Sequence, residues 1–401
     1  MQSPTTPEEL DRYDPDWCLF WAKRVTGFQF DIWLPYIRRS RYRYAILASQ
    51  DDFSGHVRDA VAELPNCVIL EPFDQAVRWL KLKPRRSLSG FLYVCTKQDN
   101  FGLVNKFGRY LHVRIGHGES DKVYNAPRTA SLYDSVFMAD YHSLRRYPRA
   151  IRSWVARGAC AIGIPIPEGA EKDPWDRPRP VRTLLYAPTW EGHTEFAAYT
   201  SLPEAGPALL AALPRLTARG TRVIVRPHGA TGARLPELKD LLARIVAAGA
   251  VLGADKRRDF LDADVMVSDV SGVTSEFLFT EKPTIMPVSA RLAGLGKDIA
   301  RLRHEYPWVE LWDPAEQDLV EVIEGLERED QLRAARARAA RRLFRGHRSL
   351  DDAVRSFDLA LGSVRWRRRG YVPVRWAYEI RRTLARLGMR PAPTKVFGNH
   401  N

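Results

Sequence analysis

The sequence predicts an α/β protein in which two domains, each built on a parallel sheet, face a central cleft and are followed by a basic helical tail. Its 401 residues exceed the length of one typical domain. Short apolar runs alternate with helical stretches, as is typical of parallel sheets whose faces are covered by helices. A polar, proline-rich stretch at 169–180 separates two such series and predicts a linker.

The first series predicts an N-terminal domain over 41–168, after an aromatic-rich segment at 1–40. Short apolar runs predict its strands, and the stretches between them predict its helices. The expected strands are 44–49, 67–70, 91–96, 110–115, 134–138 and 159–163. The expected helices are 52–64, 99–108 and 140–156.

The second series predicts a C-terminal domain over 181–345 by the same alternation. The expected strands are 183–187, 222–225, 264–267 and 284–287. The expected helical segments are 203–219, 235–248, a short turn at 258–262, a helix from 275, and 314–345. Both series therefore predict sheets whose strands all run in one direction.

The chain is basic, with 62 Lys and Arg residues against 48 Asp and Glu residues and a formal charge of +14. This balance favours anionic partners such as acidic lipid, phosphate-rich polymers or nucleic acid. Much of the excess of basic over acidic residues lies in the tail at 346–401, because nine arginines and a single acid lie between Ser363 and Arg390. A helix expected at 374–387 either contacts an anionic membrane surface or packs back on the N-terminal domain.

The four cysteines are scattered and form no Cys-x-x-Cys pair, which argues against a zinc site or disulfide scaffold. No apolar run approaches the roughly 20 residues that span a bilayer. The polar and acidic N-terminus differs from a secretory signal. We therefore expect a cytoplasmic protein that is peripheral at the inner face of the cell membrane.

The most informative motif, Ser268–Glu276, follows the apolar run at 264–267. A strand that ends in a hydroxyl-rich turn and enters a helix directs backbone N–H groups at a ligand above the sheet edge. Phosphate fits these donors, and a ribose diol fits a carboxylate. The turn predicts a donor site for a nucleotide-activated group, and ordinary helix capping is compatible with it. Its residues are Asp269, Ser271, Gly272, Ser275 and Glu276.

A histidine follows the strand expected at 110–115. Gly116 and Gly118 flank His117 and leave its imidazole uncrowded, and Lys122 follows four residues after Gly118. Such an imidazole can accept a proton from an attacking hydroxyl near neutral pH. The alternative is a loop histidine that caps the next helix. We expect His117 to be catalytic and its neighbours to lie on the acceptor side.

A second histidine repeats the pattern after the strand at 222–225. Arg226 and His228 both offer donors to phosphate, and the proline between them stiffens the turn. A surface histidine beside a structural arginine is the alternative. Thr189 follows the strand at 183–187, where it can line the cleft, and Trp190 can cover a base.

Several motifs are absent from the chain. It contains no phosphate-binding P-loop, no dinucleotide-binding Gly-x-Gly-x-x-Gly after a strand, no Gly-x-Ser-x-Gly elbow and no His-Glu-x-x-His. The ATPase, dehydrogenase, serine hydrolase and zinc protease classes therefore lack support. We expect no bound metal and no tightly bound cofactor.

Three motifs together resemble the CDP-glycerol glycerophosphotransferase family, the teichoic-acid primases and polymerases. They are His117-Gly118 with Lys122, Arg226-Pro227-His228, and Asp269 with Ser271, Glu276, Lys282 and Pro283. The resemblance covers roughly 42–345. It implies two Rossmann-like domains in a GT-B-like fold, with the acceptor-side domain first and the CDP-donor domain second. It also implies peripheral attachment to the cytoplasmic membrane face.

Carried over by position, the resemblance implies that His117 is the base, His228 a diphosphate ligand, and Glu276 a ribose ligand. An acceptor hydroxyl then attacks the phosphorus distal to cytidine, and CMP leaves. The co-substrate is CDP-glycerol or a similar CDP-polyol, and the acceptor is a lipid-linked glycan or a growing polymer. His228, Arg226 and Ser271 stabilise the developing charge.

The sequence departs from the family pattern at two turns. The usual Asp-Tyr-Ser-Ser reads Asp269-Val270-Ser271-Gly272, and the usual His-Pro reads His228-Gly229. CDP-glycerol, CDP-ribitol and other nucleotide-linked donors therefore stay open. One alternative is a GT-B glycosyltransferase that uses a nucleotide sugar for cell-surface polysaccharide. Another is a non-catalytic basic nucleic-acid-binding protein, although no nucleic-acid motif is present and we expect no such partner.

Overall fold

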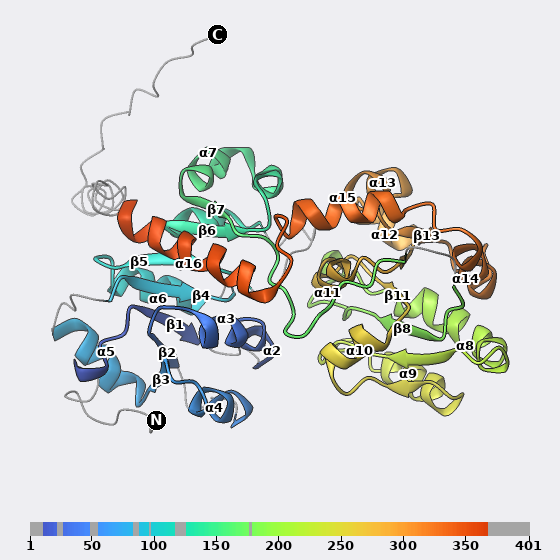
Figure 1. The fold of residues 1–401 in the computed structure, drawn as a ribbon, viewed down its shortest axis with the longest axis horizontal. Helices are drawn as coiled ribbons and strands as arrows, with labels where there is room; N and C mark the ends of the chain where they lie inside the picture. Colours follow the sequence, from blue (N-terminus) through green and yellow to red (C-terminus); the bar gives the residue numbers. More distant parts are fainter. Residues whose placement is uncertain are drawn as a thin grey trace, which may run out of the picture.

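The protein consists of two α/β domains placed side by side in the computed structural model (Figure 1). The structure describes residues 11–21, 27–48, 55–82, 88–95, 98–116, 126–175 and 179–367. Each domain contains one sheet, of seven strands in the first and six in the second, and the described pairs are all parallel. Helices cover the faces of both sheets, so the predicted fold class is confirmed.

The first sheet has the strand order β3-β2-β1-β4-β5-β6-β7. Its strands are β1 Trp17–Trp21, β2 Tyr44–Ala48, β3 Cys67–Leu70, β4 Gly90–Tyr93, β5 Leu111–Arg114, β6 Ser135–Met138 and β7 Ala159–Ala161. Its α-helices are α2 Gly27–Asp31, α3 Leu34–Arg39, α4 Gly55–Ala62, α5 Phe73–Leu82, α6 Gln98–Lys106 and α7 Arg149–Gly158. Short 3₁₀ helices η2 Arg128–Leu132 and η3 Tyr141–Arg146 follow β5 and β6.

The expected boundary at residue 41 is wrong, because the first sheet already includes β1. This strand lies between β2 and β4, with Trp17 paired to both Tyr44 and Gly90. Every residue of Trp17–Trp21 is buried. The run is buried on both faces like the strands that were predicted, so only its pairing with β2 and β4 shows that this aromatic segment is a strand. The segment predicted as an aromatic-rich extension therefore belongs to the domain core.

The second sheet has the strand order β10-β9-β8-β11-β12-β13. Its strands are β8 Thr183–Ala187, β9 Arg222–Val225, β10 Val251–Leu252, β11 Val265–Ser268, β12 Thr284–Pro287 and β13 Glu310–Trp312. The helices are α8 Leu202–Ala218, α9 Glu237–Ala247, α10 Lys256–Asp262, α11 Gly272–Phe277, α12 Ala290–Gly294, α13 Ile299–Glu305, α14 Leu319–Arg328 and α15 Arg333–Leu343. The helical stretch expected at 314–345 is thus two helices, because the chain turns between α14 and α15.

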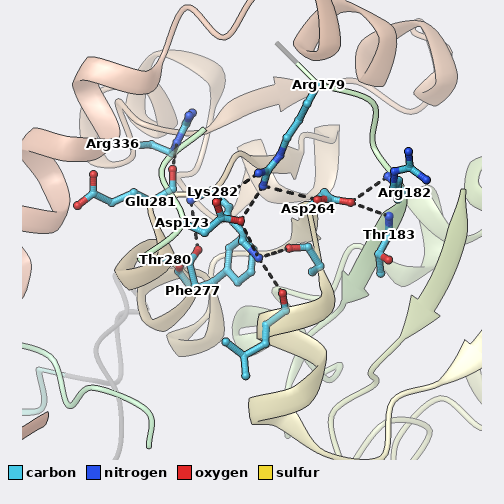
Figure 2. A network of polar contacts seen from close by, with 12 residues as sticks. Asp173, Arg179, Arg182, Thr183, Asp264, Phe277, Thr280, Glu281, Lys282 and Arg336 are labelled. Carbon is cyan, nitrogen blue, oxygen red and sulfur yellow. Dashed lines mark hydrogen bonds and ion pairs between the residues drawn. The ribbon is translucent and has the colours of Figure 1, made fainter. Parts of the chain in front are cut away.

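Buried Lys282 ties the inter-domain linker to the second domain (Figure 2). Its ammonium donates to the carbonyls of Leu261 and Ala263 at 2.8 and 2.7 Å, and it lies 3.5 Å from the Asp173 carboxylate in the linker. Arg179 also pairs with Asp173, at 2.7 Å. Burial lowers the pKa of Lys282, and the neighbouring carboxylates act in the opposite direction. This lysine, which carried part of the family resemblance, therefore holds α10 and the linker together.

The last described helix, α16 Leu350–Arg367, crosses back to the first domain (Figure 1). Its Asp358 accepts hydrogen bonds from the Ser40 hydroxyl at 2.6 Å and from the Arg41 N–H at 3.0 Å. Its Phe357 packs against Trp33 with ring centroids 5.1 Å apart. The helix expected at 374–387 lies outside the described residues. None of the described helices combines the length and apolar character that crossing a membrane requires.

Candidate functional site

The second sheet changes winding direction at β8. The chain leaves β8 for β9 on one side and later returns to β11 on the other. Ligands of such open sheets bind at the carboxyl ends of the strands that flank this switch point. Ser268 at the end of β11 donates to the Ala187 carbonyl at the end of β8 at 2.8 Å, and in the turns that follow the Thr189 N–H donates to Asp269 at 2.7 Å. The predicted donor residues after both strands therefore lie together.

The turn after β11 is locked by its own side chains. Ser271 caps α11 by accepting the Thr274 N–H at 3.4 Å, and the Thr274 hydroxyl donates to the Asp269 carbonyl at 2.6 Å. The helix begins at Gly272 rather than at Ser275, and Ser275 is buried within it. Asp269 is fully buried. The side chain of Asp269 thus sets the position of the neighbouring turn, in addition to any contact with a ligand.

Helix α10 supplies charged partners that the sequence did not indicate. Lys256 donates to the Glu276 carboxylate at 2.9 Å. Arg226, at the end of β9, donates to the Asp259 carboxylate at 2.8 Å. Glu276 and Asp259 are nearly buried, whereas the two cations are partly exposed. The residues predicted to bind ribose and phosphate, Glu276 and Arg226, are therefore held by side chains of α10. No local pattern indicated these contacts, because the partners are distant in the chain.

His228 lies beside Trp190 at this edge of the sheet. Their ring centroids are 5.8 Å apart and their planes differ by 16°, so the imidazole stacks on the indole. The His228 Nδ1 accepts the Ala230 N–H at 3.1 Å. In the neutral imidazole this hydrogen bond assigns the ring proton to Nε2, which becomes a donor suited to an anionic oxygen.

Glu191 anchors the loop that follows His228. Its fully buried carboxylate accepts the N–H groups of Gly232 at 3.1 Å, Arg234 at 2.7 Å and Leu235 at 3.2 Å. Burial raises the pKa of Glu191, but these backbone hydrogen bonds outweigh it and the net pKa is lowered. The residue is ionised at neutral pH and positions the loop that follows His228.

On the first domain, the structure describes only part of the predicted acceptor side. Gly116 has φ +72°, a conformation that favours glycine, and its carbonyl accepts the Trp33 indole N–H at 2.6 Å. His117, Gly118 and Lys122 lie outside the described residues. Within the described parts of the chain, no group of three or more His, Cys, Asp or Glu residues could hold a metal ion.

Comparisons with known proteins identify the fold. No family model and no curated protein matches the sequence. Solved structures are similar to this chain. The wall teichoic acid polymerase TagF aligns with a TM-score of 0.53 and 15% identity, over 90% of this chain and 93% of that chain. A putative UDP-N-acetylglucosamine 2-epimerase from Listeria monocytogenes aligns with a TM-score of 0.53 and 11% identity, over 87% and 96%.

A UDP-GlcNAc 2-epimerase from Neisseria meningitidis, solved with UDP-GlcNAc bound, aligns with a TM-score of 0.51 and 11% identity, over 86% of this chain and 99% of that chain. At such identities the likeness shows the fold alone, and the alignments span both domains. The chain therefore has the GT-B-like fold of two parallel-sheet domains that the teichoic acid polymerase and these epimerases share.

Proposed function

We propose that this protein is a transferase that moves a glycerol-phosphate or related polyol-phosphate unit from a CDP-activated donor to a hydroxyl of a lipid-linked glycan or teichoic-acid-like polymer, releasing CMP. The observation that carries the proposal is the convergence of the turns after β8, β9 and β11 at the switch point of the second sheet. TagF shares the fold, and some of its structures come from crystals soaked with CDPG.

The donor side of the mechanism follows from the second domain. His228 presents Nε2–H as a donor, and Arg226 retains donors beyond the one that pairs with Asp259. These groups bind the diphosphate and stabilise the charge that develops on it as CMP departs. Glu276, held by Lys256, contacts the ribose hydroxyls, and Trp190 lies beside the base. Fixed donors are effective here because they need no reorganisation during the reaction.

The acceptor side rests on His117, the residue after Gly116 at the carboxyl end of β5. In the proposed reaction its imidazole takes the proton of the acceptor hydroxyl while that oxygen attacks the distal phosphorus of the donor. The bond from this phosphorus to the bridging oxygen breaks, and CMP leaves with the electron pair. The polyol phosphate ends as a phosphodiester on the acceptor.

The test is to incubate the purified protein with a panel of CDP-polyols and nucleotide sugars and to identify the nucleotide released. We expect CMP from a CDP-polyol. His117→Ala is expected to bind CDP-glycerol and release no CMP, and His228→Ala to bind it more weakly. His304→Ala, at an exposed histidine of α13, is the matched control and is expected to behave as wild type. Wild-type turnover by His117→Ala would refute the assignment of the base.

The second candidate is a glycosyltransferase that uses a nucleotide sugar, with attack at the anomeric carbon. It is favoured by the epimerases of the same fold, one of which was solved with UDP-GlcNAc. Release of UDP or GDP from the same panel would identify this activity instead. We further propose that the protein works peripherally at the inner face of the membrane, where its lipid-linked acceptor lies.

A further inference from the structure

Helix α15 exposes a row of arginines on the side that faces away from the core. The helix contains five arginines and no acidic residue, and it lies along the upper edge of the molecule in Figure 1. Arg338 and Arg341 of the helix and Arg345 just beyond its end are exposed. They are spaced three and four residues apart, which makes them neighbours on one face. These three residues are called the arginine row. The buried residues of the helix are Arg336, Ala339, Ala340 and Leu343.

The fold does not use the charges of the arginine row. Among the residues that the structure describes, no side-chain hydrogen bond or ion pair engages these three guanidinium groups. Two other arginines of α15 are engaged: buried Arg336 donates to Asp330 at 2.9 Å, and Arg342 lies 3.2 Å from Asp140. Like charges three or four residues apart destabilise a helix. Helix stability therefore does not account for the row.

The backbone of Arg345 points to the same conclusion. Arg345 follows the cap of α15 in a left-handed conformation, with φ +53°. The helix end is closed by the Gly346 N–H, which donates to the Arg341 carbonyl at 2.8 Å. Glycine is the usual residue in such a conformation at a helix end, because a side chain carries a steric cost there. Glycine would form this helix end at lower cost, so the fold does not require an arginine at position 345.

The basic surface continues from α15 onto η3 of the first domain. The contact between Arg342 and Asp140, the cap of η3, holds the two elements together. Tyr141, the next residue, is 58% exposed, and Arg145 of η3 is also exposed. Tyrosine is enriched where proteins meet the polar region of a bilayer, because its ring is apolar and its hydroxyl is polar. The surface thus combines unpaired cations of α15 with an exposed aromatic ring.

We propose that the arginine row, with Tyr141 beside it, docks the folded part of the protein on an anionic lipid surface. The row lies on the outer side of a helix at an edge of the molecule. A convex row of cations suits a flat layer of phosphate head groups, whereas single polyanion strands are typically bound in grooves. The inference rests on the proposed function, which places the acceptor in lipid. It assigns the contact to α15, whereas the sequence pointed only to the tail.

The test measures how the full-length protein partitions onto vesicles of equimolar phosphatidylcholine and phosphatidylglycerol, in a flotation assay at increasing lipid concentration. Each arginine near such a surface contributes about fivefold to the partition coefficient. Joint replacement of Arg338 and Arg341 by glutamine is therefore expected to lower this coefficient about tenfold or more. The matched control replaces Arg244 and Arg258, which are exposed on α9 and α10, by glutamine and is expected to change it little. An equal loss in both double variants would show an effect of net charge alone and would overturn the proposal.

Arg345→Gly separates docking from folding. Because glycine relieves the left-handed conformation, the temperature of unfolding is expected to stay the same or rise, while the partition coefficient falls about fivefold. A purely structural role predicts that both quantities fall together. Arg345→Lys is expected to keep most of the partitioning because it retains the charge. Partitioning of Arg345→Gly that equals wild type would overturn the assignment of the row.

Two controls identify the partner and separate this proposal from the proposed function. Vesicles of phosphatidylcholine alone are expected to bind weakly, and equal binding to both vesicles would overturn the proposal. If the double variant of Arg338 and Arg341 lost binding to duplex DNA but kept binding to vesicles, the row would serve a nucleic acid instead. A wild-type protein that floats through the arginine row but releases no CMP from any CDP-polyol would refute the transferase function and leave the docking surface standing. CMP release by wild type, together with unchanged flotation of the double variant, would refute only the docking surface.

Discussion

Replacing Glu191 by glutamine tests how the His228 loop is held in place. One carboxylate oxygen of Glu191 accepts the N–H groups of Arg234 and Leu235, and the other accepts the N–H of Gly232. Glutamine keeps one acceptor oxygen but turns an N–H₂ group toward the third donor, and it loses the charge that strengthens all of these bonds. Hydrogen bonds to charged groups contribute about 1.5–3 kcal/mol each.

We therefore expect Glu191→Gln to lower the free energy of unfolding by about 2–4 kcal/mol, since at least one such bond is lost and the others weaken. Urea denaturation followed by circular dichroism measures this free energy of unfolding. Glu195→Gln, at an exposed glutamate farther along the segment after β8, is the control and is expected to change it little. An equal stability of the Glu191→Gln and wild-type proteins at neutral pH would refute the assignment of Glu191 as the anchor.

The effect of Glu191→Gln on stability is expected to depend on pH. The pKa of Glu191 is lowered in the folded protein from its ordinary value of 4.5. The unfolded state therefore binds the proton more readily, and the contribution of the carboxylate to stability is fully present above that ordinary value. It is lost as the pH falls through the folded pKa. The stability difference between wild type and Glu191→Gln is expected to shrink in acid, and a difference that grew instead would contradict the sign of the shift.

Two further predictions concern the linker and the tail. Lys282→Met leaves the carbonyls of Leu261 and Ala263 without their ammonium donor and is expected to lower the free energy of unfolding by about 2–4 kcal/mol. Lys106→Met, at an exposed lysine of α6, is its control in the same urea titration, and an equal effect of both changes would contradict the structural role. A protein that ends at residue 367 retains α16 and is expected to float less with anionic liposomes than the full-length protein, because it loses most of the tail arginines. Flotation that is equal for both proteins and insensitive to salt would remove the tail from membrane binding.

Local sequence patterns were sufficient to predict most of the strands. β2, β3, β8, β9 and β12 are apolar runs bounded by polar turns, and the structure places them within a residue of the predicted bounds. β1 escaped prediction although Trp17–Trp21 is as apolar and as buried as β2, because its place between β2 and β4 is set by tertiary pairing. The helix α5 was also missed, between β3 and β4.

The sequence alone determined which polar residues follow strands, because hydroxyl-rich and glycine-containing turns are local signals that the nearest neighbours specify. Only the tertiary structure decided which of these turns meet, since strand order brings β11 beside β8 although about 80 residues separate them in the chain. The same holds for the partners Lys256, Asp259 and Glu191. Such contacts depend on packing between distant segments, for which no local pattern exists.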